Sequence, residues 1–244
     1  MRPALLSLLL CAACTLPGAR AQPAPVPPFS AMPPGAPLAP WRIAGLPGQK
    51  LPLTQFSIQP VEGQRVLQVA AEASYGNLVL DTVGARVTGE TRLQWRWTLL
   101  RGLPAADLRT KAGDDVALKV CALFDMPLDG LPLGERARMR VARSLSGEHL
   151  PAATLCYVWD RTLPVGTALP NAFSARVRYI VVSSGEAAPG AWPRIERPLA
   201  ADFLRAFGAE ASSVPPLLAI AVGADADNTG GRSLGLVSDI QLLP

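Results

Sequence analysis

Two groups of acidic side chains offer the clearest chemistry in this sequence. Asp114 and Asp115 come directly before an apolar run, and Asp225, Asp227 and Asn228 stand together near the C-terminus. Calcium takes about six to eight oxygen ligands, and closely spaced Asp and Asn side chains on a turn supply several of them. The second group therefore predicts a calcium site at Asp225, Asp227 and Asn228, with calcium as the one candidate cofactor. A turn whose Asp and Asn side chains bond to their own backbone is the alternative.

The same aspartates are candidates for the acid and base of an envelope polysaccharide hydrolase. Such an enzyme needs two carboxyl groups facing each other across the scissile bond, at least one with a raised pKa. No strand-like run in the chain carries alternating acidic side chains. His149 is the only histidine, so a Ser-His-Asp or Cys-His arrangement would have to use it. We therefore name no catalytic residue and expect a protein without catalysis, with enzymatic activity left open.

Two tryptophans are candidates for contacts with a sugar. Exposed Trp side chains stack on sugar rings, and Trp159 and Trp192 stand outside the alternating run that holds Trp95 and Trp97. The predicted ligand-binding residues are accordingly Trp159, Trp192, Asp114 and Asp115. Packing of both tryptophans in the core is the alternative.

The elements that must position these side chains begin after an export signal. Residues 1–21 have a positively charged start, an apolar run too short to span a bilayer, and small residues at Ala19 and Ala21. We expect cleavage before Gln22 and a periplasmic or secreted protein. Lipidation of Cys14, which would anchor the chain at the cell envelope, is the alternative.

Proline sets the next boundary. Residues 22–40 are rich in Pro and Ala, which favours an extended, flexible tether, because proline removes backbone donors and fixes φ. We expect a single domain over residues 41–244. Of the four cysteines in the chain, Cys121 and Cys156 remain after cleavage. In an oxidising compartment they predict a disulfide, with two buried free thiols as the alternative.

Charge and hydropathy exclude two classes of partner. The formal net charge is +4, and removal of the signal lowers it to about +2 with no basic run, so nucleic-acid binding is not expected. No stretch after the signal is apolar for the roughly 20 residues that a transmembrane helix needs.

The rest of the chain has mainly a period of two. In Leu93 to Leu99, apolar and polar residues alternate strictly, which predicts a half-buried strand with Trp95 and Trp97 on one face. Further strands are expected at Phe56 to Gln59, Val66 to Ala71, Asn77 to Asp81, Val116 to Phe124, Thr154 to Trp159, Arg176 to Ser183, Leu217 to Val222 and Leu234 to Leu242. These strands predict a mainly all-β fold, a two-sheet antiparallel β-sandwich or jelly roll.

Two segments depart from that period and predict short inserted helices. Residues 133–145 place Leu133, Ala137, Val141 and Leu145 at intervals of four, beside a basic face. Residues 199–207 form the second helix, ended by Gly208, where we expect a left-handed conformation.

An ordered set of motifs resembles a known family. The set comprises LQWRW from Leu93, GDD from Gly113, YVW from Tyr157, a DF and FG segment from Asp202 to Gly208, and DADNT from Asp225 before a final DI pair at Asp239. The chain is similar to the bacterial family catalogued as domain of unknown function 3047 over nearly all of residues 41–243. The resemblance implies an exported protein of Gram-negative bacteria and no particular activity.

These features predict an exported, non-catalytic β-sandwich protein that binds a glycan or another component of the cell envelope. The polysaccharide hydrolase is one alternative. A structural or assembly factor of the envelope is another, working through protein contacts of the basic helix face formed by Arg136, Arg138, Arg140 and Arg143.

Overall fold

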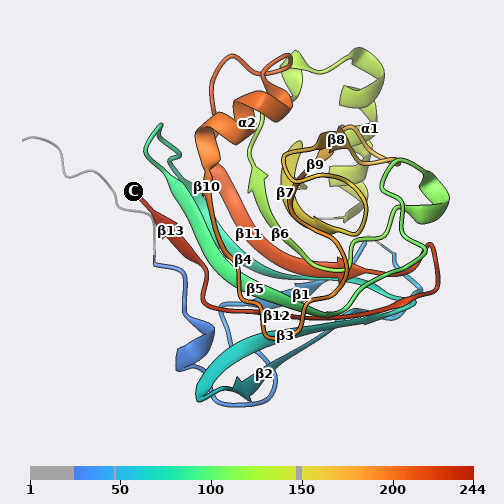
Figure 1. The fold of residues 1–244 in the computed structure, drawn as a ribbon. Helices are drawn as coiled ribbons and strands as arrows, with labels where there is room; N and C mark the ends of the chain where they lie inside the picture. The colour runs from blue at the N-terminus through green and yellow to red at the C-terminus, as the bar shows by residue number, and fades with distance from the viewer. Residues whose placement is uncertain (1–24, 47, 147–149) are drawn as a thin grey trace, which may run out of the picture.

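The architecture is two curled β-sheets packed face to face with an apolar core between them, as Figure 1 shows. The computed structural model describes residues 25–46, 48–146 and 150–244. The expected signal sequence at 1–21, Cys14 and His149 lie outside the described residues. The predicted β-sandwich is confirmed. No helix within the described ranges has the length and hydropathy to cross a membrane.

The first sheet has seven strands. Their order is β1 (Arg42–Ala44), β4 (Tyr75–Ala85), β11 (Leu217–Asp225), β6 (Lys119–Phe124), β7 (Ala153–Asp160), β9 (Val177–Ser184) and β8 (Ala168–Pro170). All neighbours in this sheet are antiparallel except β7 and β9, which run parallel. A parallel pair needs a crossover of a dozen or more residues, which residues 161–176 supply.

The second sheet has six strands. It comprises β10 (Arg194–Pro198), β5 (Arg92–Arg101), β12 (Arg232–Val237), β3 (Gln64–Glu72) and β2 (Gln55–Val61), with β13 (Gln241–Leu243) paired to β5. The single strand expected from Leu234 to Leu242 is wrong. The chain leaves the ladder at Ser238, whose N–H donates to the Arg96 carbonyl at 2.8 Å while its hydroxyl accepts from the Arg96 N–H at 2.9 Å.

The alternating run on β5 behaves as its pattern predicts. Trp95 and Trp97 are fully buried and lie edge to face, with ring centroids 5.4 Å apart. Trp95 also lies 5.5 Å from Tyr157 of the opposite sheet, so the two sheets meet through aromatic rings. The period of the sequence does not predict β1, β8 and β10, because these edge strands are only three to five residues long.

Helix α2 (Leu199–Phe207) caps the core as predicted. Its Phe203 packs on Phe124 of β6, with ring centroids 4.6 Å apart. The left-handed conformation expected at Gly208 is wrong, because φ there is −61°. The remaining short helices are η1 (Phe29–Ala31), η2 (Lys111–Gly113) and η3 (Leu128–Gly130).

Helix α1 (Leu133–Ser146) is present as predicted, but its orientation is not the one that its apolar stripe suggests. Leu133, Ala137 and Val141 are exposed, while Met139 packs against the core. An ion pair between Glu135 and Arg176 of the sandwich, at 3.1 Å, holds the opposite side of the helix inward.

Part of the segment expected as a flexible tether, residues 22–40, packs against the sandwich. Phe29 is fully buried and packs on Trp41, with ring centroids 4.9 Å apart. The Ser30 N–H and hydroxyl both donate to the Asp239 carboxylate, at 2.8 and 2.6 Å. Gly35 and Ile58 form a β-bridge. Buried aromatic area and hydrogen bonds therefore outweigh the extended preference of proline, and the folded part of the chain begins before Trp41.

Candidate functional site

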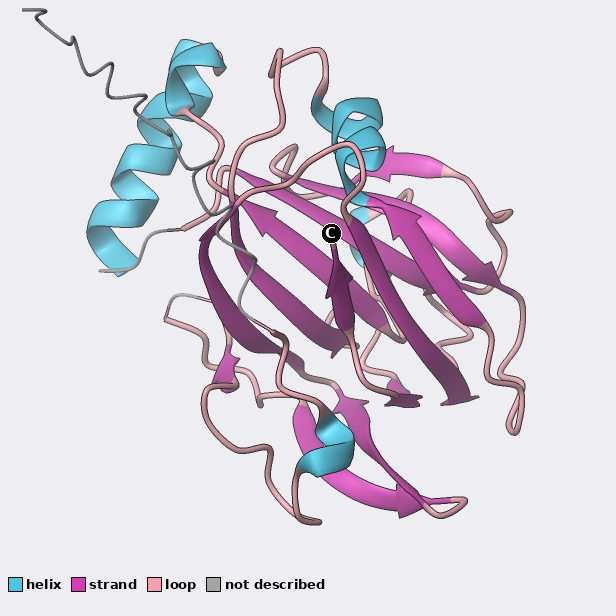
Figure 2. Ribbon diagram, turned by 90° about the vertical axis from the view of Figure 1, so that its left-hand side faces the viewer, coloured by secondary structure: helices cyan, strands magenta, loops and turns pink. Residues whose placement is uncertain are grey.

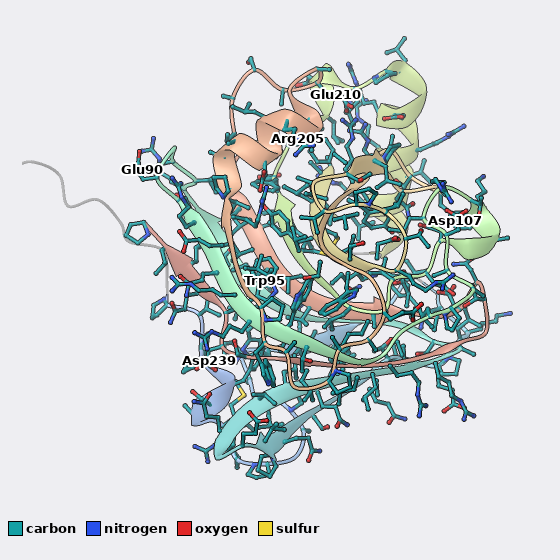
Figure 3. All side chains as sticks on the ribbon, in the orientation of Figure 1. Glu90, Trp95, Asp107, Arg205, Glu210 and Asp239 are labelled. Carbon is teal, nitrogen blue, oxygen red and sulfur yellow. A yellow bond between two sulfur atoms is a disulfide. The ribbon has the colours of Figure 1, made fainter. Side chains whose placement is uncertain are left out.

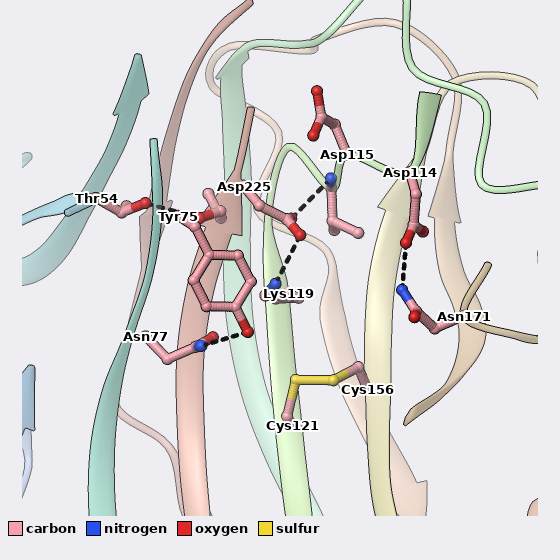
Figure 4. Close-up of polar contacts among 12 residues, drawn as sticks. Thr54, Tyr75, Asn77, Asp114, Asp115, Lys119, Cys121, Cys156, Asn171 and Asp225 are labelled. Carbon is pink, nitrogen blue, oxygen red and sulfur yellow. Dashed lines mark hydrogen bonds and ion pairs between the residues drawn. A yellow bond between two sulfur atoms is a disulfide. The ribbon is translucent and has the colours of Figure 1, made fainter. Parts of the chain in front are cut away.

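Sheet topology gathers most of the predicted site residues at one end of the seven-stranded sheet. Strand β11 lies between β4 and β6, and its register places Asp225 opposite Tyr75 and Gly223 opposite Lys119. The segment before β6 brings Asp114 and Asp115 to the same end. We call Tyr75, Asp114, Asp115, Lys119 and Asp225 the buried polar cluster, which Figure 4 shows in close-up.

An ion pair stands at the centre of this cluster. The Lys119 ammonium lies 3.2 Å from the Asp225 carboxylate, and both side chains are almost fully buried. Asp225 also accepts from the Val116 N–H at 2.8 Å. Lys119 lies 4.9 Å from the Tyr75 ring centroid, a cation–π contact. Burial acts to lower the pKa of Lys119, but the neighbouring Asp225 charge raises it above its usual value, so the ammonium stays charged.

Asp115 anchors the turn that follows β11. Its carboxylate accepts from the Asn228 N–H at 3.0 Å, the Thr229 N–H at 2.8 Å and the Thr229 hydroxyl at 2.5 Å. Several hydrogen bonds stabilise this buried carboxylate. Asp115 thereby joins the segment before β6 to the turn after β11, which is far away in the sequence.

Asp114 has a different environment. It accepts from the Asn171 side-chain amide, and the Tyr179 hydroxyl lies 3.4 Å away. Burial and the nearby Asp225 charge raise the pKa of Asp114 to about 6. The protonated form is therefore well populated in mildly acidic solution. Its side chain is buried, however, which keeps it from direct contact with a ligand.

The three predicted calcium ligands have different contacts. Asp225 pairs with Lys119, and the Asn228 side-chain N–H donates to the Asp115 carboxylate. Asp227 shares neither contact, and burial raises its pKa. Within the described residues there is no group of three or more His, Cys, Asp or Glu side chains arranged to hold a metal ion. The geometry therefore gives the calcium prediction no support.

The predicted disulfide is confirmed. Cys121 of β6 lies opposite Cys156 of β7 in the antiparallel ladder, and their sulfur atoms are bonded. Figure 4 shows it on the same face of the sheet as the buried polar cluster. It links β6 and β7 across this face.

The two predicted sugar-stacking tryptophans have different positions. Trp159 is only 6% exposed, donates from its indole N–H to the Gly185 carbonyl at 3.0 Å, and packs near Trp97. It belongs to the core and cannot stack on a ligand. Trp192 is half-buried in the loop before β10. The structure thus brings Asp114 and Asp115 together. Neither Trp159 nor Trp192 joins them.

A second place collects polar side chains and is open. Where β12 ends and β13 begins, a hollow of about 210 Å³ lies on the six-stranded sheet beside η1. We call it the β5–β13 hollow. It is lined by Ser30, Gln64, Arg65, Gln94, Trp95, Arg96, Ser238, Asp239 and Gln241. Figure 3 labels Trp95 and Asp239, which mark its position on the fold.

The contacts within the hollow leave several donors available. Asp239 is already engaged by Ser30, and Arg65 donates to the Ser30 carbonyl at 2.8 Å. Gln94 accepts from Arg194 at 2.7 Å through its oxygen. Within the described part of the chain, the Arg96 guanidinium and the amides of Gln64 and Gln241 have no side-chain hydrogen bond.

The sequence does not predict this hollow, although one signal points to it. The strict alternation of Leu93 to Leu99 puts Gln94 and Arg96 on the outer face of the sheet. What joins them to Gln64, Arg65 and Gln241 is strand register, which no local pattern reveals. A second, smaller cavity beside Trp159 and Asp160 measures about 20 Å³, room for a water molecule and not for a sugar.

Comparison with known proteins gives a family match and distant structural likenesses. A family model described as "Protein of unknown function (DUF3047)" matches residues 39–241. No curated protein matches the chain. The expected family resemblance is confirmed.

Among solved structures, the Cel12A catalytic domain of Humicola grisea in complex with a soaked thio cellotetraose is 12% identical. Its TM-score is 0.42, with 83% of this chain and 92% of that chain covered. Endoglucanase 3 of Trichoderma harzianum, from family GH12, is 10% identical with a TM-score of 0.41, covering 85% and 99%. The cellulose induced protein Cip1 is 13% identical with a TM-score of 0.37, covering 83% and 90%. At these values the likenesses carry no argument about what this chain binds.

Proposed function

The chain belongs to the DUF3047 family of proteins of unknown function, and from that premise we propose that it is an exported, non-catalytic protein that binds a glycan of the cell envelope. The β5–β13 hollow is the observation that carries the proposal. Sugar hydroxyls both donate and accept hydrogen bonds, and the hollow offers unengaged amides at Gln64 and Gln241 beside the Arg96 guanidinium. A site of this kind fixes a sugar by several convergent polar contacts.

Trp192 is the one tryptophan of the predicted ligand set that keeps a place in this proposal. It is half-buried, and it precedes by two residues Arg194, whose guanidinium donates to Gln94 in the hollow. Trp192 does not line the hollow itself, so only a sugar that extends across β5 toward β10 would reach it. Asp114, Asp115 and Trp159 act instead as internal supports of the fold.

Export is supported by the signal-like residues 1–21 and by the disulfide. A bond between Cys121 and Cys156 persists in the periplasm or outside the cell, where thiols are not kept reduced. We place the protein there, with lipid anchoring through Cys14 as the alternative.

One observation favours the hydrolase alternative. Asp114 has a pKa of about 6, which suits a general acid. Its burial and its contacts with Asn171 and Tyr179 argue against this role, and Asp225, the nearby carboxylate, is committed to Lys119.

The test is a screen of envelope oligosaccharides on an array, followed by product analysis of every bound sugar after prolonged incubation. We expect at least one glycan to be retained and recovered intact, with and without EDTA. Failure to retain any glycan at millimolar concentration would overturn the proposal. Release of shortened sugars, lost in Asp114→Asn, would establish the hydrolase instead.

A further inference from the structure

Helix α1 presents an apolar stripe to solvent. Leu133 is 79% exposed and Val141 57% exposed, and Ala137 between them is exposed as well. Residues four apart lie one above the other on a helix, so the three side chains form one continuous face. Met139 faces the sandwich instead. An amphipathic helix normally buries its apolar side, so this stripe is available for another surface.

Two arginines border that stripe. At about 100° per residue, Arg140 lies about 20° to one side of Leu133, and Arg138 lies about 60° beyond Val141 on the other side. Both are exposed, and neither makes an ion pair or a side-chain hydrogen bond within the described residues. The acidic residue of the helix, Glu135, is turned toward Arg176. The outward face is therefore apolar along its centre and positively charged on both sides.

Helix α1 lies at one side of the molecule. Figure 2 shows it as the left-hand helix, standing beside the sandwich. Its inner side is fixed by the Glu135–Arg176 ion pair and by Arg136, which donates to the carbonyls of Asp129 and Leu131. The outward stripe is thus held in place before any partner binds.

We propose that α1 docks on the anionic surface of a lipid bilayer. Leu133, Ala137 and Val141 enter the boundary between headgroups and acyl chains, while Arg138 and Arg140 extend to lipid phosphates. The stripe is convex and lies on one helix, with positive charge on both sides. This shape and charge complement a flat, negatively charged surface. The proposal is independent of glycan binding, because the β5–β13 hollow lies on the other sheet.

The test is co-sedimentation of the protein, purified after export, with vesicles of phosphatidylcholine alone or with one third phosphatidylglycerol. We expect binding to the anionic vesicles only, weakened by added salt. Arg138→Gln with Arg140→Gln should lower the partition coefficient about 25-fold, since each basic residue near an anionic surface contributes about fivefold. Leu133→Ser with Val141→Ser should lower it by about tenfold or more.

The matched control is Arg86→Gln with Val165→Ser, which removes an exposed arginine and an exposed apolar side chain that do not belong to α1 and should bind as the parent does. Thermal unfolding checks that each variant is folded. Equal binding to neutral vesicles, or binding unchanged in both helix variants, would overturn the proposal. No binding to anionic vesicles would also overturn it and would leave an acidic protein as the candidate partner of α1.

Discussion

Lys119 and Asp225 are charged side chains in a place where isolated charge is costly. Each is almost fully buried, and they satisfy each other at 3.2 Å. Removing two charges from water costs several kcal/mol per ion, which a well-placed partner and further hydrogen bonds offset. The Val116 N–H and the Tyr75 ring supply the additional contacts. The pair therefore holds three segments of the chain together and is too enclosed to meet a ligand.

We expect Lys119→Met to lower the free energy of unfolding by about 3–5 kcal/mol, because Asp225 would be left as an unpaired buried charge. Adding Asp225→Asn to this variant should restore part of the loss. Denaturant unfolding measures both. The matched control is Asp81→Asn, which breaks the exposed Arg42–Asp81 pair and should cost less than about 1 kcal/mol. A Lys119 variant as stable as this control would contradict the account.

Asp114 makes stability depend on pH. Its folded-state pKa of about 6 lies above the value of about 4 for an unfolded aspartate, so the folded state binds the proton more tightly. The contribution of Asp114 to stability is accordingly largest below pH 4 and is lost as pH rises through about 6. Asp114→Asn should unfold with a weaker pH dependence between pH 4 and 7 than the parent. The exposed Asp129→Asn is the control, and an unchanged slope in the Asp114 variant would refute the prediction.

At this scale the sequence indicated residues that do come together in the fold. The two aspartate groups do meet, as clusters beside strand ends suggested. Lys119 was not foreseen, because a lysine inside an apolar strand becomes meaningful only when the register sets it beside Asp225. For the same reason Trp159 could not be assigned to the core from its neighbours alone.

Strand register also explains the disulfide. Cys121 and Cys156 lie opposite each other on β6 and β7, 35 residues apart in the sequence. The compartment and the cysteine count predict the pair, and only the ladder supplies the geometry.

Cys121→Ala with Cys156→Ala should lower the free energy of unfolding by about 4 kcal/mol, the loop-closure value for a bridge of this separation. Unfolding with and without dithiothreitol measures the effect. Reductant should destabilise the parent and leave the double variant unchanged. Equal stability of parent and variant in oxidising buffer would contradict the prediction.

The segment before Trp41 is a second element whose role came from packing. Proline content alone favoured a tether, yet Phe29 inserts into the core beside Trp41. We expect Phe29→Ala to cost about 3–5 kcal/mol, as for other buried aromatic truncations. The exposed Phe173→Ala serves as the control, and denaturant unfolding distinguishes them. If Phe29→Ala lowered the free energy of unfolding no more than the control does, this segment would instead behave as a flexible tether.

On the scale of the whole molecule, the two sheets differ in how their polar side chains are enclosed. The buried polar cluster and its loops close one end of the seven-stranded sheet. The six-stranded sheet carries the open β5–β13 hollow. Composition and period sufficed to predict two sheets and two helices. Composition and period do not predict the hollow. It forms where the chain leaves the ladder between β12 and β13 and where η1 packs against Asp239.

The most direct test of glycan recognition by the hollow is a calorimetric titration of the best array ligand into three proteins. Gln94→Ala with Arg96→Ala removes two side chains of the hollow, and Gln55→Ala with Arg101→Ala removes an exposed pair elsewhere on the same sheet. We predict that the hollow variant binds at least about tenfold more weakly, since each lost hydrogen bond costs about 1 kcal/mol and those to a charged group more. The control should bind as the parent does. Equal affinity of the hollow variant and the parent would contradict the account.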